Sequence, residues 1–256
     1  MIFTKRMSLE DKRFYSHVFR LVMPMAVQNL INVGVTSTDV IMLGKVGETA
    51  LSGVSLANQI YFILSLLYFG LTSGACVLTA QYWGKKDTRT IEKVMGMSFR
   101  ISILAGIVFA AAAFFFPYQL MRIFTTDEAV IAAGISYLKI VAFSYVLSAF
   151  TNVYLNIIRS IEQVVIATIV YGTSLAANII LNAIFIFGLF GAPAMGAAGA
   201  ALGTLCSRAV EVVIVVFYAV KINHVVKIRF KDWFVKDKAL AKDFFTYAFP
   251  VLLNEI

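Results

Sequence analysis

The sequence predicts an all-α membrane protein built around a bundle of six membrane-spanning helices. Three observations predict this class. Hydrophobic residues make up 60% of the 256-residue chain and charged residues only 14%, whereas a soluble domain carries about 25% charged residues. Six apolar stretches each reach the roughly 20 residues that a helix needs to cross a bilayer. Most of the 22 Lys and Arg residues fall on one side of these stretches, as the positive-inside rule predicts.

The first stretch covers residues 17–44 and follows a charged arm, residues 1–16. It contains Pro24, which removes a backbone N–H donor and is expected to act as a hinge. It also contains one acid, Asp39, among Val, Ile, Met and Leu side chains. Because a carboxylate in hydrocarbon is costly, Asp39 is expected to face a cavity or polar partners and to couple transport to an ion. The alternative is an acid that only holds the bundle together.

The other five spans follow in order, separated by polar or Gly/Pro-containing turns, and are predicted at about residues 51–82, 94–116, 130–157, 164–188 and 195–220. Residues 117–130 between the third and fourth spans indicate a partly amphipathic connector. After the sixth span, Trp233 and Phe234 of a basic segment suit a helix at the membrane interface.

The distribution of charge places the N-terminus and the basic segment 221–242 in the cytoplasm. It accounts for the net charge of +8 without a nucleic-acid partner. No zinc-protease HExxH, hydrolase GxSxG, phosphate-binding P-loop or CxxC pattern occurs in the chain. The sequence therefore predicts neither an enzyme nor an ATP-driven pump, and no cofactor is expected.

A short repeat predicts how the chain is organised. Residues 249–255 repeat the pattern of residues 23–29, in which an apolar residue and Pro precede a polar pair four and five positions on. Copies that enter the membrane in the same direction are typical of parallel transporter repeats. We therefore expect residues 1–220 to form a six-helix lobe, residues 221–242 to link two lobes, and residues 243–256 to begin a truncated second lobe. Glu255 is a candidate for a matching site in that lobe.

Polar side chains in the later spans are candidate partners of Asp39 in a binding site. Asn178 and Asn182 lie four residues apart and therefore on one helical face. Further oxygen and nitrogen groups come from the fourth and sixth spans: Tyr137, Asn152 and Thr204. Together with Asp39 they predict a site for Na⁺ or H⁺, between which the spacing does not choose; hydrogen bonding between helices is the alternative. No other metal site is expected.

Arg208 and Glu211 lie three residues apart in the sixth predicted span. They therefore share a helix face and are expected to form a structural ion pair.

In these residues the chain resembles the first half of a bacterial MATE (multidrug and toxic compound extrusion) transporter. The resemblance covers nearly the whole chain and rests on motifs in a fixed order: Pro24 with Gln28-Asn29, TDVIMLGKVG at 38–47, LTAQYWGKKD at 78–87, YLKIVAF at 137–143, NIILNAIFIFG at 178–188 and MGAAGAALGT at 195–204. It implies one lobe of a two-lobe, 12-helix transporter in the bacterial inner membrane. That transporter would export lipophilic, often cationic compounds in exchange for Na⁺ or H⁺.

The resemblance also implies a cation site in the first lobe, and it identifies Pro24 with the bending proline of the first span. Carried over by motif, the site comprises Asp39, Tyr137, Asn152, Asn178, Asn182 and Thr204. The sequence departs from the family at Asn182, where many members have a second acid. Expected partners are small-molecule substrates, membrane lipid and the second lobe. A lipid-linked saccharide flippase of the same superfamily and a non-transporting half-transporter that serves assembly are the alternative functions.

Overall fold

A computed structural model describes residues 9–234 and 237–255. Within these ranges the chain forms helices and no strand. The long helices are α1 (Leu9–Val46), α2 (Glu48–Gly84), α3 (Thr88–Phe115), α5 (Glu128–Ser160), α6 (Val165–Phe187), α7 (Ala197–Phe217) and α8 (Lys238–Glu255), with the short α4 (Pro117–Arg122) between α3 and α5. Six of them, α1, α2, α3, α5, α6 and the extended α7, are long and apolar enough to cross a membrane. The predicted all-α, six-span bundle is confirmed.

Short elements fill the connections. The 3₁₀ helix η1 (Leu189–Gly191) follows α6, the π-helical turn η2 (Tyr218–Ile222) extends α7, and the 3₁₀ helix η3 (Phe230–Phe234) lies between α7 and α8. The segment predicted as a partly amphipathic connector contains α4, which begins at Pro117. Proline fits there because the first turn of a helix needs no N–H donor.

Capping residues mark the boundaries of several helices. Asp87 caps α3 by accepting a hydrogen bond from the Thr90 N–H at 3.1 Å, and Asp127 caps α5 by accepting one from the Ala129 N–H at 2.8 Å. Gly188 ends α6 in the left-handed conformation, with φ of 74°, which glycine adopts without a steric penalty.

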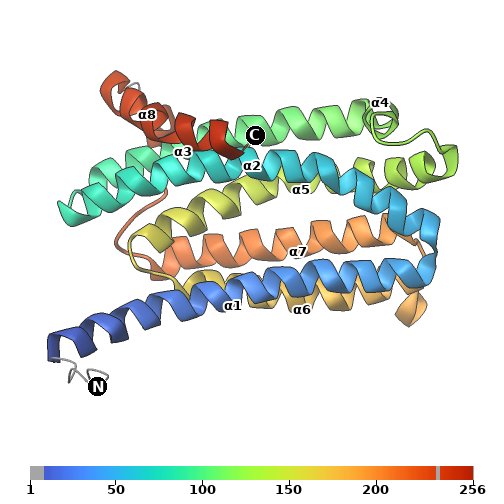
Figure 1. The fold of residues 1–256 in the computed structure, drawn as a ribbon, viewed down its shortest axis with the longest axis horizontal. Helices are drawn as coiled ribbons and strands as arrows, with labels where there is room; N and C mark the ends of the chain where they lie inside the picture. The colour runs from blue at the N-terminus through green and yellow to red at the C-terminus, as the bar shows by residue number, and fades with distance from the viewer. Residues whose placement is uncertain (1–8, 235–236, 256) are drawn as a thin grey trace, which may run out of the picture.

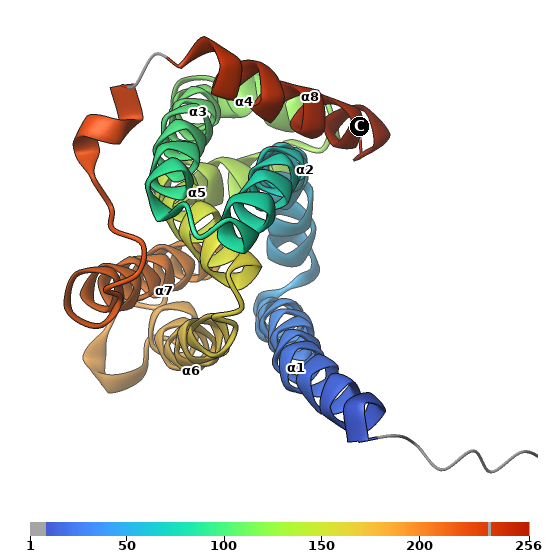
Figure 2. The ribbon, with the colours of Figure 1, turned by 90° about the vertical axis from the view of Figure 1, so that its left-hand side faces the viewer.

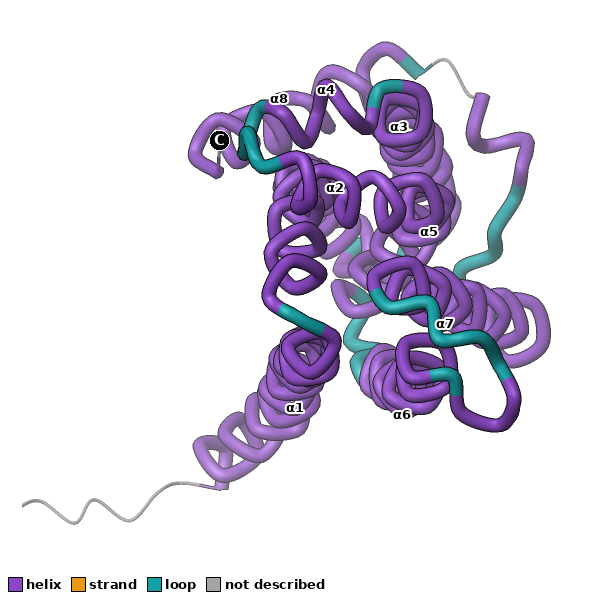
Figure 3. The backbone as a smooth tube through the Cα atoms, turned by 90° about the vertical axis from the view of Figure 1, so that its right-hand side faces the viewer, coloured by secondary structure: helices purple, strands orange, loops and turns teal. Residues whose placement is uncertain are grey.

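The long helices run roughly side by side (Figure 1). In the view along the bundle, α1, α6 and α7 lie on one side and α2, α3 and α8 on the other, with α5 between them (Figure 2). The opposite view shows the same division, with α1 next to α2 across a single turn (Figure 3). The buried side chains of α5 form much of the core, and the Tyr68 hydroxyl donates to the Tyr145 carbonyl at 2.9 Å to tie α2 to α5.

The helix α1 runs through Pro24 and is fastened to α5 and α6 just after it. The Gln28 amide donates to the Thr168 hydroxyl at 2.9 Å and to the Val164 carbonyl at 3.2 Å, and it accepts from the Arg159 guanidinium at 2.7 Å. Gln28 is 2% exposed. The residue that marked the repeat therefore also holds the middle of α1 in place, while the hinge role of Pro24 stays a prediction.

The segment before α8 is held against the start of α3 by four charged residues, Arg89, Glu92, Arg229 and Asp232, which we call the ion-pair clamp. Arg89 donates to both Asp232 carboxylate oxygens, at 2.6 and 2.7 Å, and to Glu92 at 2.9 Å. Glu92 also accepts from Arg229 Nε at 3.1 Å and from the Lys227 N–H at 3.0 Å.

Trp233 and Phe234 both lie in the five-residue helix η3 of this segment. The Trp233 ring stacks on Phe99 of α3 at 5.2 Å, whereas Phe234 is exposed. That this helix lies at the membrane interface stays a prediction. Glu255 lies in the last turn of α8, but its side chain, like residues 1–8, 235–236 and 256, is outside what the structure describes.

Candidate cation site

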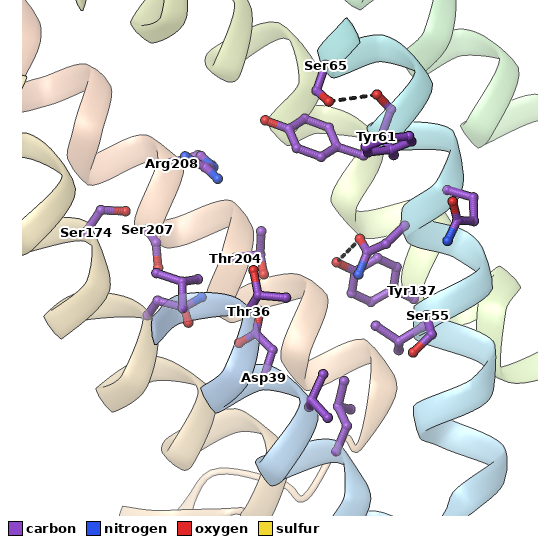
Figure 4. Close-up of a pocket in the computed structure, with 18 of the residues that line it drawn as sticks. Thr36, Asp39, Ser55, Tyr61, Ser65, Tyr137, Ser174, Thr204, Ser207 and Arg208 are labelled. Atoms are coloured by element: carbon purple, nitrogen blue, oxygen red, sulfur yellow. Dashed lines mark hydrogen bonds between the residues drawn. The ribbon is translucent and has the colours of Figure 1, made fainter. Parts of the chain in front are cut away.

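A cavity of about 680 Å³ opens between α1, α2, α5, α6 and α7. We call it the Asp39 cavity. Figure 4 shows side chains from these helices directed into it. Five of the six residues predicted for the cation site line the cavity: Asp39, Tyr137, Asn152, Asn178 and Thr204. The sixth, Asn182, contacts Asp39 from behind the cavity wall.

The centre of the site is a chain of polar contacts between α1 and α6. The Asn182 amide N–H₂ donates to Asp39 Oδ1 at 2.5 Å and to Asn178 Oδ1 at 3.2 Å. Both Asn side chains are buried, and the Asn182 Oδ1 atom has no hydrogen-bond partner among the described residues. Asp39 is thus bonded to the Asn face of this helix, while the Asn182 oxygen is buried against Gly203 of α7.

Close packing of α6 and α7 holds Asn182 in position. Gly203 of α7 lies directly against Asn182, so that a side chain at Gly203 would collide with it. The sequence places small residues along this face of α7, and small residues let membrane helices approach closely. Glycine at 203 therefore allows the two helices to meet at the site.

The opposite wall of the cavity comes from α2 and α5. The Tyr137 hydroxyl donates to Asn58 Oδ1 at 3.0 Å. Thr36, Asp39 and Thr204 point toward one another across the cavity, with Tyr137 facing them (Figure 4). Asn58 and Thr36 were not predicted. The polar pair Asn58-Gln59 within an otherwise apolar span was the available signal for Asn58.

Asn152 lines the same cavity but is separated from the Asp39 contacts. It lies about 22 Å along α5 from Tyr137, at 1.5 Å of rise per residue. Its side-chain N–H₂ donates within its own helix, to the Ser148 carbonyl at 2.8 Å. Asn152 also borders a second cavity of about 340 Å³, which Ser65, Thr72 and Asn156 line with it. The structure therefore does not bring Asn152 to Asp39.

A charged pair occupies the same cavity further along α7. Arg208 Nη1 donates to Glu211 Oε1 at 2.7 Å, which confirms the predicted pair. The Arg208 side chain is 25% exposed and the Glu211 side chain 1%. Both residues line the Asp39 cavity, so this pair faces the same space as the candidate cation site.

The chemistry of the site suits a small monovalent cation. Asp39 supplies one negative charge, and neutral oxygens from amides and hydroxyls surround it. Hard oxygen ligands of this kind bind alkali and alkaline-earth cations, and a carboxylate can instead take up a proton. One carboxylate with neutral oxygens becomes electrically neutral when it binds Na⁺ or H⁺.

Comparison with known proteins gives consistent matches. The MatE family model matches residues 24–184. A probable multidrug resistance protein NorM of Thermotoga maritima is 27% identical over 194 residues, 75% of this chain and 41% of the relative. The multidrug resistance protein NorM of Vibrio cholerae is 24% identical over 242 residues, 94% of this chain and 52% of the relative.

Among solved structures, a MOP superfamily transporter from Pyrococcus furiosus has the same fold, with a TM-score of 0.83 at 23% identity. The match covers 93% of this chain and 52% of that chain. The chain thus spans about two fifths to half of the length of the proteins it matches.

Proposed function

The chain belongs to the MatE family, a family of multi-pass membrane transporters, and from that premise we propose that it forms part of a secondary active efflux transporter. The transporter exports lipophilic or cationic compounds in exchange for Na⁺ or H⁺. The observation that carries the proposal is the position of Asp39, a carboxylate inside a membrane bundle that faces a cavity and is bonded to Asn182. Ionisable residues in such positions usually serve ion or substrate pathways.

The walls of the Asp39 cavity fit the proposed substrates. Aromatic and aliphatic side chains alternate with the polar groups there, among them Tyr61, Phe62, Val54 and Tyr171. Aromatic rings attract cations and provide apolar surface at the same time. A lipophilic cation could therefore contact the rings while an acid balances its charge.

The proposed arrangement in the membrane follows from charge. The ends of α2, α5 and α7 that meet near Lys85, Arg159 and Lys221 face the cytoplasm of a bacterial inner membrane, as the positive-inside rule requires. Residues 1–220 form the first lobe, and residues 221–242 link it to a second lobe that begins at residue 243, within α8. The resulting transporter has two lobes, and substrate passes between them.

The flippase alternative is less well supported by the cavity. Recognition of a lipid diphosphate calls for several cationic side chains. Among the described residues that line the Asp39 cavity, Arg208 is the basic one, and it is paired with Glu211.

A transport assay tests the proposal. Proteoliposomes that contain the complete two-lobe transporter are loaded with ethidium, and efflux is driven by an inward Na⁺ or H⁺ gradient. We expect Asp39→Asn to abolish gradient-driven efflux while its helical circular dichroism and melting temperature stay close to those of the wild type. Asp243→Asn, which changes an exposed acid of α8, is the matched control and should transport normally. Equal efflux by wild type and Asp39→Asn would overturn the proposal, and no efflux from the wild type would favour the non-transporting alternative.

A further inference from the structure

Arg208 and Glu211 are joined by a single hydrogen bond. Of the five N–H donors of the guanidinium, Nη1 alone bonds Glu211, through Oε1 at 2.7 Å. The second carboxylate oxygen, Oε2, is buried and has no partner among the described residues. A structural Arg–carboxylate pair usually forms two parallel bonds. The single bond therefore leaves the guanidinium free to contact another group.

The place of Arg208 on α7 puts it between two carboxylates. It lies one turn after Thr204, which faces Asp39, and three residues before Glu211 (Figure 4). Helical side chains lean toward the N-terminus of their helix. In the structure the guanidinium is bonded to Glu211, and the Arg208 side chain lines the Asp39 cavity and is 25% exposed. Turning toward the Thr204 end would therefore follow the ordinary lean of a helical side chain.

Three charged side chains are found among the described residues that line the Asp39 cavity. Asp39 and Glu211 are its acids and Arg208 is its basic residue, among the described residues that line it. The other titratable groups that face it are the phenols Tyr61, Tyr137 and Tyr171 from α2, α5 and α6. The cavity is thus neutral when one monovalent cation is bound. When the cation leaves, the cavity keeps one net negative charge, and Arg208 is the cation that its two carboxylates, Glu211 and Asp39, can share.

We propose that Arg208 is a built-in counter-cation that pairs with Glu211 while an ion occupies Asp39 and turns to Asp39 when the ion has left. The inference rests on the proposed function of Asp39. Arg208 then competes with Na⁺ or H⁺ for the same carboxylate. This competition weakens cation binding enough for the ion to be released during each transport cycle.

Two variants distinguish this exchange from a fixed ion pair. In Glu211→Gln the guanidinium loses its first partner and pairs with Asp39, so cation binding weakens by on the order of tenfold. In the double variant Arg208→Gln/Glu211→Gln the competitor is gone, so binding strengthens by on the order of tenfold relative to the wild type. The double variant also leaves no unpaired charge buried, which protects its folding. A fixed pair predicts a much smaller change in the double variant, because the opposite charges of Arg208 and Glu211 largely cancel at Asp39.

Two readouts measure cation occupancy of the purified protein. Na⁺ binding is followed with ²²Na⁺ at constant pH, and protonation of Asp39 is followed through the carboxylic C=O infrared band that disappears in Asp39→Asn. The proton readout applies even to a protein that does not bind Na⁺. Glu48→Gln, an exposed acid at the start of α2, serves as the control and should bind cations as the wild type does.

The results for the different variants distinguish the exchange from a fixed ion pair and from a failure of the proposed function. Weaker binding in Glu211→Gln together with tighter binding in the double variant supports the exchange. Unchanged or weaker binding in the double variant, or unchanged binding in Glu211→Gln, overturns it and leaves a structural pair. Binding that persists undiminished in Asp39→Asn instead overturns the proposed function itself.

Discussion

Buried or partly buried carboxylates occur in two regions of this molecule, and the two regions differ in how fully these carboxylates are paired. In the ion-pair clamp, Glu92 accepts hydrogen bonds from Arg89, Arg229 and the Lys227 N–H, and Asp232 accepts two from Arg89. In the Asp39 cavity, Asp39 accepts one bond from Asn182, and Glu211 keeps one oxygen without a partner among the described residues.

The difference shows what each region is built for. The carboxylates of the clamp already have cationic partners, and a further ligand would add little to their stability. These ion pairs hold the segment before α8 against α3. Incomplete pairing in a cavity leaves charge and lone pairs that a cation or substrate can satisfy, at a cost to stability when they stay unmet. The same residue types thus stabilise structure in one region and, in the function we propose, bind a cation in the other.

Adding a second acid to the cavity should produce the largest change. Asn182→Asp places another carboxylate beside Asp39, so the site becomes more negative and should bind Na⁺ or H⁺ about 10- to 100-fold more tightly. Competition binding with ²²Na⁺ and proton uptake measure this change. Asn156→Asp, on α5 and away from Asp39, is the matched control. Equal affinity in the Asn182 variant and the wild type would show that Asn182 does not act on the cation.

Removing a charge from the clamp should affect stability and leave binding intact. Glu92→Gln loses its two ion pairs while keeping its shape, and should lower the free energy of unfolding by about 1–3 kcal/mol. Thermal unfolding in detergent measures the change, with the exposed Glu48→Gln as control. If Glu92→Gln alters cation affinity with no loss of stability, the contrast between the two regions does not hold.

A smaller effect is expected at the helix cap between α2 and α3. Hydrogen bonds from the Thr90 hydroxyl and N–H lower the pKa of the Asp87 carboxyl. Asp87→Ala should therefore cost about 1 kcal/mol at neutral pH. The folded pKa is below the unfolded value of about 4, so the stabilisation is complete above that value and disappears as the pH falls through the folded pKa.

Melting temperatures of wild type and Asp87→Ala, compared between pH 7 and pH 3, check this sign. The difference should shrink as the pH falls. Asp243→Ala, an exposed acid of α8 outside a cap, should show neither the loss at neutral pH nor its recovery in acid. A difference for Asp87→Ala that grows in acid would contradict the cap.

The sequence predicts the helices well because hydropathy and length decide which segments can cross a bilayer. It also predicts contacts within one helix, as the pairs Asn178 with Asn182 and Arg208 with Glu211 show. Asp39 is recognisable because an acid in an apolar span is rare. These features depend on local spacing and composition alone.

Contacts between distant helices could not be predicted in the same way. Asn58 pairs with Tyr137 only because α2 packs on α5, and nothing in either segment indicates the register of that packing. Gln28 looked like a repeat marker, yet its partners come from the end of α5, the start of α6 and the turn between them. The sequence also did not predict that ion pairs between Arg89, Asp232, Glu92 and Arg229 hold the segment before α8 against α3.

Cation binding at equilibrium tests the central claim, that the Asp39 cavity binds a monovalent cation. ²²Na⁺ binding and proton uptake are measured on purified wild type and Asp39→Asn over a series of pH values. The account predicts saturable uptake of one cation per cavity, Na⁺ binding that weakens on acidification, and loss of both signals in Asp39→Asn. Uptake that is the same in the two proteins would contradict it.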